Sequence, residues 1–377
     1  MMRHLVPLVA LLVACPGPPE DSDSGWDSDT EADSDTEPDS DTEPDSDTEP
    51  DSDTDTEAPA IVGVESRAEQ LSCLPWLGQP PGALSDTGCV SRNDASQPTD
   101  EFIPYTVNSP LWSDGADKER YLVLPTGTTA TLDDNGDLLL PVGTVLGKWF
   151  YVDGALIEVR LFAHRATGWT GASWQWDPLS DDGFLQASGN TLTLDNGQTW
   201  SIPNTGQCIQ CHTNAAQGAL GLELAQLDRS WDYPSGVTAD QVTTLQHLDI
   251  LPSELPAIAP LADPAGDGSL EDRARGYLHA NCSGCHQPGG GTPYPMDLRI
   301  HTPLADAATC GEAAANSLGL EDMQRVAPGD SAHSMVHERM GRTDVRMPPV
   351  GTNQLHEDGI ALVAAWIDSM SACPEAE

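Results

Sequence analysis

The sequence contains few basic residues. Only 16 of its 377 residues are Lys or Arg, against 60 Asp and Glu, so the formal net charge at pH 7 is −44. Binding to nucleic acid or to anionic lipid surfaces depends on Lys and Arg. The composition therefore argues against both and favours a partner whose docking face is basic or neutral.

A long apolar run is also missing. Beyond the N-terminus, no stretch is apolar for long enough to cross a bilayer. No Ser/His/Asp triad, Gly-rich phosphate loop or metal-binding His pair stands out either. The length predicts two or three soluble domains.

The N-terminus has the pattern of an export signal. Met1–His4 carries charge, Leu5–Ala14 is a short apolar run, and Leu12-Val13-Ala14-Cys15 resembles a bacterial lipobox. Residues 1–15 are therefore expected to be a lipoprotein signal peptide, with Cys15 as the lipidated residue. An ordinary cleaved signal is the alternative. Both predict export to the periplasm or the cell surface, and lipidation predicts a membrane anchor.

Residues 16–59 form an acidic, low-complexity segment. Glu20–Glu57 contains 19 acidic residues and no basic one, and the remainder of the chain still carries a net charge of −25. Asp-Ser-Asp-Thr-Glu-Pro occurs three times in succession between Asp33 and Pro50. Such a segment repels itself and buries no apolar surface, so we expect a disordered tether. Calcium binding is less favoured because no ligand register is present.

Residues 60–204 show strand signals. Short apolar runs such as Tyr121–Pro125 and Lys148–Val152 are separated by turn residues, as at Asp153-Gly154 and Asp195-Asn196-Gly197. An antiparallel β-rich domain, a sandwich or a barrel, is therefore expected. The residue pattern then becomes typical of helices, over residues 215–227, 239–248 and 270–280.

Two Cys-x-x-Cys-His motifs follow, Cys208-Ile209-Gln210-Cys211-His212 and Cys282-Ser283-Gly284-Cys285-His286. At this spacing two thiols lie about one helical turn apart and can form thioethers to both vinyl groups of one haem, with the adjacent His on the iron axis. A zinc site is a less favoured interpretation, because tetrahedral zinc coordination does not need a His next to the second Cys of each pair. The motifs predict two covalently bound haem c groups, with His212 and His286 as axial ligands.

The remaining cysteines form an even set. Removing Cys15 and the four motif cysteines from the nine in the chain leaves Cys73, Cys89, Cys310 and Cys373. An exported chain favours two disulfides, and the nearest pairs are Cys73 with Cys89 and Cys310 with Cys373. Sequence alone leaves the other two pairings open.

Met347 is the expected sixth ligand of the second haem. It lies in Arg346-Met347-Pro348-Pro349, between His286 and a C-terminal helical pattern. Met323, Met335 and Met340 are poorer candidates because of their helical context. The stretch from Ser269 to Ser371 resembles class I cytochrome c domains, and that resemblance implies His/Met ligation, a raised reduction potential and one-electron transfer.

The sixth ligand of the first haem stays open. His164, which follows an expected strand, and His247, on an expected helix, are the candidates. An open position is the third possibility.

Three further segments widen the resemblance: Asn108–Ala116, Pro141–Thr144 and Ile202–Thr205. With the haem motifs, they are similar to a bacterial family of exported dihaem cytochromes with a β-rich front half. That resemblance implies an α+β chain: the β-rich domain, then an all-α haem region with a first haem segment at 205–262 and a class I cytochrome c-like domain at 263–374.

The expected function is that of a dihaem electron carrier rather than an enzyme, with a redox protein as donor or acceptor. Two alternatives are a peroxidase-like haem enzyme with an open first haem and the cytochrome subunit of a membrane-associated dehydrogenase. The β-domain could hold the cytochrome against such a dehydrogenase or a cell-surface sugar.

Overall fold

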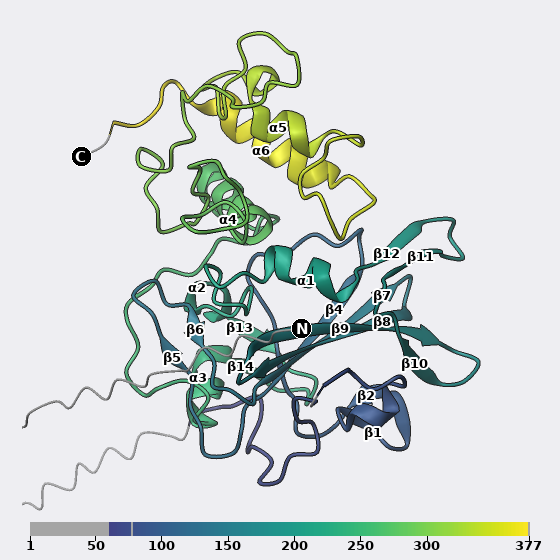
Figure 1. The fold of residues 1–377 in the computed structure, drawn as a ribbon. Coiled ribbons are helices and arrows are strands. Elements are labelled where there is room, and N and C mark those ends of the chain that lie inside the picture. Colours follow the sequence, from purple (N-terminus) through teal and green to yellow (C-terminus); the bar gives the residue numbers. More distant parts are fainter. Residues whose placement is uncertain (1–59, 77, 376–377) are drawn as a thin grey trace, which may run out of the picture. The chain divides into compact units, whose positions relative to one another are not determined.

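The computed structural model describes residues 60–76 and 78–375 (Figure 1). The chain divides into two units, 1–57 and 58–377, and the described residues belong to the second. The expected signal peptide, Cys15 and the acidic tether lie outside the described residues.

A six-stranded antiparallel sheet is the largest element, with the strand order β10-β9-β8-β7-β4-β3. Its long central strands are β7 (Val145–Val152) and β8 (Ala155–Arg165). Asp153 and Gly154 join them with positive φ angles of 50° and 77°, as a two-residue hairpin turn requires. The other strands are β3 (Ile103–Tyr105), β4 (Asp117–Val123), β9 (Gly168–Asp177) and β10 (Asp182–Leu185).

Both faces of this sheet are covered, because alternate side chains of β7 and β8 are buried on opposite sides. One face carries Trp149 and Trp174, which pack with the chain around the Cys73–Cys89 disulfide. The other face carries Leu146 and Phe162 and packs towards α1, α2 and α3. We call this second side the α1 face.

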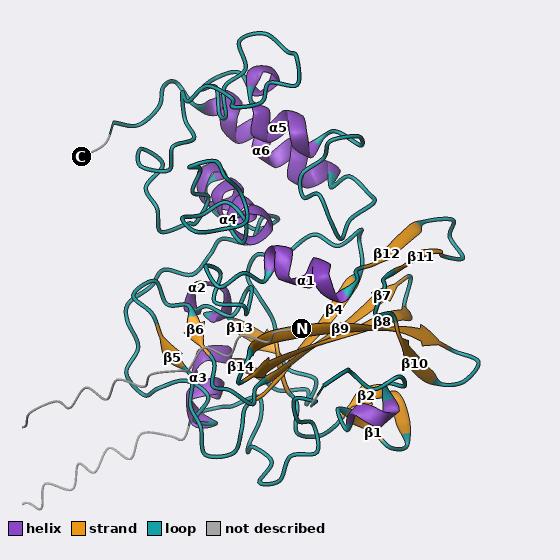
Figure 2. Ribbon diagram, viewed as in Figure 1, coloured by secondary structure: helices purple, strands orange, loops and turns teal. Residues whose placement is uncertain are grey.

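The remaining strands form four small hairpins, and the helices are short (Figure 2). The hairpins are β1 (Val90–Ser91) with β2 (Asp94–Pro98), β5 (Thr131–Leu132) with β6 (Leu138–Leu139), β11 (Asn190–Thr193) with β12 (Thr199–Ile202), and β13 (Ser230–Asp232) with β14 (Thr238–Asp240). The helices are α1 (Thr205–Cys211), α2 (Leu224–Leu227), α3 (Gln241–His247), α4 (Leu270–Cys282), α5 (Met335–Met340) and α6 (Glu357–Ser369), with 3-10 turns η1 (Ser85–Thr87) and η2 (Ser331–His333).

The expected fold class, with an all-α second half, is wrong. The β13–β14 hairpin lies inside residues 205–262, and residues 263–374 contain three α-helices joined by long irregular segments. The expected helix over residues 215–227 shrinks to the four residues of α2. Gln217, Gly218 and Gly221 before it adopt positive φ, which ends a helix. The described chain is mainly antiparallel sheet.

Two disulfides are present, Cys73–Cys89 and Cys310–Cys373. The second joins the chain before η2 to the residues that follow α6. The four motif cysteines are free thiols.

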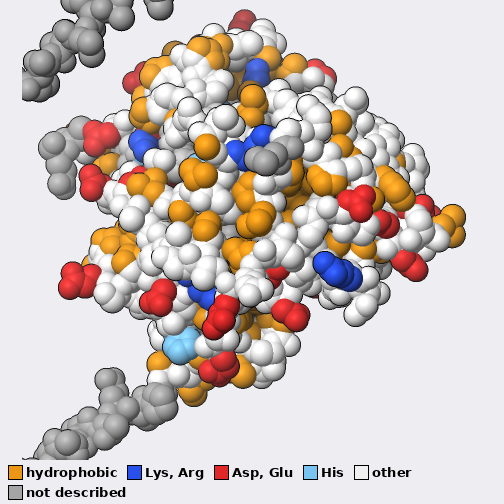
Figure 3. Space-filling model, turned by 60° about the horizontal axis from the view of Figure 1, so that its bottom comes forward, with side chains coloured by type: hydrophobic (Ala, Val, Ile, Leu, Met, Phe, Trp, Pro, Cys, Tyr) orange, Lys and Arg blue, Asp and Glu red, His pale blue; other side chains and the backbone are white. Residues whose placement is uncertain are grey.

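Acidic side chains are spread over the face drawn in Figure 3, whereas Lys and Arg occur there in small groups. Among the described residues, no helix is both long enough and apolar enough to cross a membrane.

The segment Asn108–Ala116, between β3 and β4, connects the sheet to the C-terminal helices. The Ser109 hydroxyl donates to the Gly276 carbonyl in α4 (3.0 Å), and the Trp112 N–H donates to the Asn281 side chain (2.7 Å). The buried carboxylate of Asp114 accepts the backbone N–H groups of Asn353 (2.7 Å) and Gln354 (2.9 Å) before α6. We call Asn108–Ala116 the docking segment.

Replacing Asp114 should destabilise the protein. In Asp114→Ala, the N–H groups of Asn353 and Gln354 lose their acceptor, and we expect the free energy of unfolding to fall by about 1–3 kcal/mol. Urea titration followed by tryptophan fluorescence measures this change. Asp195→Ala, at an exposed position, is the matched control and should shift stability by less than about 0.5 kcal/mol. Equal losses in the two variants would contradict the role of Asp114.

Candidate functional site

The first Cys-x-x-Cys-His motif lies on α1. Asn204 caps this helix through a reciprocal pair of hydrogen bonds with Gln207, which fixes where the helix starts. Cys208 and Cys211 are consequently three residues apart on one helix, about one turn. His212 ends the helix, and its N–H donates to the Cys208 carbonyl (3.0 Å).

Helix α1 packs closely on the α1 face of the sheet. A Cβ atom at Gly171 of β9 would lie only 2.9 Å from the Cys208 sulfur, so a glycine there permits the approach. The imidazole of His212 lies against Phe162 of β8, with ring centroids 4.1 Å apart. The sheet therefore supports both the cysteine and the histidine of the motif.

His212 is held in one tautomer. Its Nδ1 donates to the Gly218 carbonyl (2.7 Å), which leaves Nε2 without a proton. Desolvation and the positive charge of Lys148 lower the pKa of His212 to about 3. A neutral imidazole whose second nitrogen is oriented by a backbone carbonyl is the form that binds a metal.

The second motif begins at the end of α4. The Ser269 hydroxyl accepts the Asp272 N–H and caps the helix, which then places Cys282 in its last turn. His286 Nδ1 is buried without a hydrogen-bond partner in the described part of the chain. Desolvation and the charge of Arg339 lower the pKa of His286, so this imidazole too is neutral at pH 7.

The two motifs touch each other. The Cys285 thiol donates to the Gln210 carbonyl of the first motif (3.3 Å), and the Cys285 thiol raises the pKa of Cys211. A Cβ atom at Gly284 would lie 3.5 Å from the Cys211 carbonyl. Motifs more than 70 residues apart in the sequence thus form one site.

Met347 and His286 are each linked to Arg339. The backbone N–H of Met347 donates to the Arg339 carbonyl (3.0 Å), and the charge of Arg339 contributes to the lowered pKa of His286.

The expected sixth ligands of the first motif are held elsewhere. His164 donates from Nδ1 to the Leu140 carbonyl (2.9 Å) and stacks on Trp169. Trp169 stacks in turn on Phe162, the ring that contacts His212, so two aromatic rings separate the two histidines. His247 on α3 donates from Nε2 to the Glu65 carbonyl (2.9 Å).

Within residues 60–76 and 78–375, no group of three or more His, Cys, Asp or Glu side chains is placed to hold a metal ion. No family model matches the chain, and neither does any curated protein or solved structure. The expected membership of a family of exported dihaem cytochromes, and the likeness of the C-terminal part to class I cytochrome c, are therefore wrong. Both rested on short motifs, which specify local chemistry but leave the surrounding fold free.

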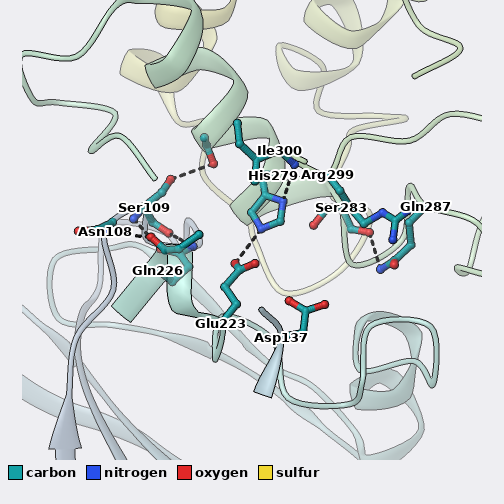
Figure 4. Close-up of polar contacts among 12 residues, drawn as sticks. Asn108, Ser109, Asp137, Glu223, Gln226, His279, Ser283, Gln287, Arg299 and Ile300 are labelled. Atoms are coloured by element: carbon teal, nitrogen blue, oxygen red, sulfur yellow. Dashed lines mark hydrogen bonds and ion pairs between the residues drawn. The ribbon is translucent and has the colours of Figure 1, made fainter. Parts of the chain in front are cut away.

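A second polar cluster, not predicted from the sequence, lies between the β-rich part and α4 (Figure 4). His279 Nε2 donates to the Glu223 carboxylate (2.7 Å), while His279 Nδ1 accepts the Ile300 N–H (3.1 Å). Asp137 lies beside Glu223, and both Glu223 and His279 are more than nine-tenths buried. We call Asp137, Glu223 and His279 the buried triad. Glu223 and His279 are 56 positions apart, so no local pattern joins them.

Burial and mutual charge set the protonation of this triad. Desolvation and the charge of Glu223 raise the pKa of Asp137 to about 7, with Asp133 adding to the effect. Desolvation would raise the pKa of Glu223, but the charge and hydrogen bond of His279 outweigh it and lower that pKa. The charge of Glu223 in turn raises the pKa of His279 despite its burial. Arg299 and His301 are the other charged or titratable groups near the triad.

Asp137→Asn should flatten the dependence of stability on pH. A carboxyl whose folded pKa is about 7, against an ordinary value of 3.8, contributes stability below about pH 4 that is lost as the pH rises through 7. We therefore expect the variant to exceed the parent in free energy of unfolding by clearly more at pH 8 than at pH 5, and to match it only below about pH 4.

Denaturant titrations at pH 5 and pH 8 measure the difference. Asp134→Asn, at an exposed position three residues away, is the control and should follow the parent at both pH values. Parallel curves for Asp137→Asn and its parent would rule out a protonated Asp137.

Proposed function

We propose that the chain carries two covalently attached haem groups, one at each Cys-x-x-Cys-His motif, and transfers electrons outside the cytoplasm. When bound, each haem supplies an iron that gains and loses one electron. The contact between the two motifs carries the proposal, because an electron carrier with two haems needs them close together. The hydrogen bond from Cys285 to Gln210 brings the attachment points into contact.

The residues at the first motif have the chemistry that such a group needs. Cys208 and Cys211 are free thiols on one helical turn, and His212 presents an unprotonated Nε2. A porphyrin would itself supply most of the ligands of its iron, so His212 would need to provide one of the few that remain. One or two side chains then suffice, and a cluster of three protein ligands is not needed.

At the second motif, Cys282 and Cys285 are free thiols, and His286 is neutral. We propose that Met347 would supply a second ligand to this iron, because it follows the second motif in a Met-Pro loop and its backbone N–H donates to the carbonyl of Arg339, whose charge acts on His286. A thioether ligand favours reduced iron, so this haem would have the higher potential.

Export fits the remaining features. The two disulfides are typical of an oxidising compartment, and the lipobox-like sequence at Cys15 favours a membrane-anchored lipoprotein. The net negative charge favours a redox partner with a basic or neutral docking face, which could be a membrane-associated dehydrogenase.

A peroxidase-like activity at the first motif is the second candidate. One observation favours it: His164 and His247 are both engaged with backbone carbonyls away from His212. An iron without a sixth protein ligand would be open to peroxide. A high-spin absorption band in the oxidised protein, together with peroxide turnover, would identify this activity.

Loss of one cysteine pair should remove one haem. The full chain, produced with a c-type haem attachment system, should carry two haems by haemochrome spectroscopy and mass spectrometry. Each of two double variants should carry one haem, because each motif supplies its own two thioethers. These variants are Cys208→Ala/Cys211→Ala and Cys282→Ala/Cys285→Ala. Ser91→Ala, remote from both motifs, should keep two. A parent chain without covalent haem would refute the proposal.

Met347→Ala should lower the reduction potential of one haem and leave the other within experimental error, because loss of the thioether destabilises the reduced iron. A spectroscopic redox titration resolves the two potentials. Met323→Ala is the matched control, since Met323 is buried elsewhere in the C-terminal part. Unchanged potentials in Met347→Ala would remove this residue from the ligand set.

A further inference from the structure

Three basic side chains form a row across the centre of the sheet. Arg120 of β4 is paired with Lys148 of β7, and Lys148 is paired with Arg160 of β8. Directly paired residues point to the same face, so all three project from the α1 face. Lys118, two residues before Arg120, lies on this face as well. Lys118 and Lys148 are the two lysines of the whole chain.

These cations have few partners. Arg160 pairs with the buried Glu158 (2.6 Å), while Arg120 donates to the Lys118 carbonyl (3.2 Å) and is only 9% exposed. Lys118 donates to the Leu111 carbonyl and the Ser113 hydroxyl. Among the described residues, the Lys148 ammonium makes no hydrogen bond or ion pair. Four basic side chains thus lie on one face with a single carboxylate, that of Glu158.

Apolar side chains flank the partly buried row, in which the Arg160 side chain is 27% exposed. Leu146 and Phe162 lie on one side of it along β7 and β8, in the cluster against which Cys208 packs. Phe150 lies on the other side and packs on Trp200. Like charges in direct cross-strand positions destabilise a sheet, and buried charges are normally paired. An excess of positive charge in this setting calls for an anion.

The row also faces the first motif. Phe162, two residues beyond Arg160 on β8 and on the same face, contacts the His212 imidazole with ring centroids 4.1 Å apart, and a Cβ atom at Gly171 of β9 would lie 2.9 Å from the Cys208 sulfur. Desolvation, Arg120 and Arg160 lower the pKa of Lys148 to about 7. A nearby anion would reverse that effect on the lysine.

We propose that Arg120, Lys148 and Arg160 form a binding site for an oxyanion, a carboxylate or a phosphate, between the sheet and the first motif. Guanidinium groups bind such anions through paired N–H donors, and the lysine adds a point charge. The anion has two possible sources: a small solute, or the carboxylates of a haem attached at Cys208 and Cys211. The site itself does not depend on the proposed function.

Inorganic phosphate is a suitable probe, with the full chain in two forms: the parent and Cys208→Ala/Cys211→Ala. Thermal unfolding is followed at constant pH against phosphate, with sodium chloride at equal ionic strength as the reference. A saturable rise in the midpoint in both forms indicates a free solute. A rise only in the double variant indicates that haem carboxylates occupy the site in the parent. No rise beyond sodium chloride in either form overturns the proposal.

Lys148→Met tests the site in the form that responds to phosphate and should abolish the rise. Arg92→Met removes one exposed charge elsewhere and should retain it. If Lys148→Met responds like Arg92→Met, the site is not the one proposed.

Acetylation of the native chain gives a reading that does not depend on a variant that folds. In the form that responds to phosphate, modification of Lys148 by acetic anhydride, measured by mass spectrometry, should slow about tenfold at a phosphate concentration ten times the dissociation constant. An unchanged rate in that form would overturn the proposal. If the chain attaches no haem, the electron-transfer function is refuted. If phosphate still protects Lys148 in that chain, the anion site is nevertheless supported.

Discussion

The carboxylate of Asp114 holds together the two halves of the described chain. It lies in the docking segment between β3 and β4 and binds the backbone just before α6 through Asn353 and Gln354. Asn353 also hydrogen-bonds Ser201, on the strand that leads into α1. Together with the hydrogen bonds from Ser109 and Trp112 to α4, this carboxylate attaches the helical part to the sheet, and with it the second motif to the first.

This arrangement turns two local motifs into a joint site. Each motif is built independently: one by the capped helix α1 on the sheet, the other by the last turn of α4. The hydrophobic cores that support the two motifs are separate. Helices α4 and α6 pack together in one core, which includes Val363 and Trp366 of α6, while α1 packs on another core around Phe162. Only the docked arrangement lets the Cys285 thiol reach the Gln210 carbonyl.

Local features of this structure could be read from the sequence, and long-range ones could not. The hairpin turn at Asp153-Gly154 follows from residues that tolerate positive φ. The helical content of the second half was overestimated, because Ala and Leu at helical spacing between 215 and 227 were outweighed by Gly218 and Gly221. The buried triad and the row of Arg120, Lys148 and Arg160 consist of residues far apart in the sequence. Only the sheet register and the packing of α4 against the β-rich part bring them together.

The stack of Trp169 on Phe162 has a consequence for His212. Phe162 touches the imidazole itself, and Trp169 packs so closely on Gly218 that a Cβ atom there would lie 2.2 Å from the indole. Gly218 supplies the carbonyl that orients His212. The two rings thus act as a clamp on both ends of one hydrogen bond. A substitution at Trp169 would therefore loosen the carbonyl that orients His212, although its own stacking partners are Phe162 and His164.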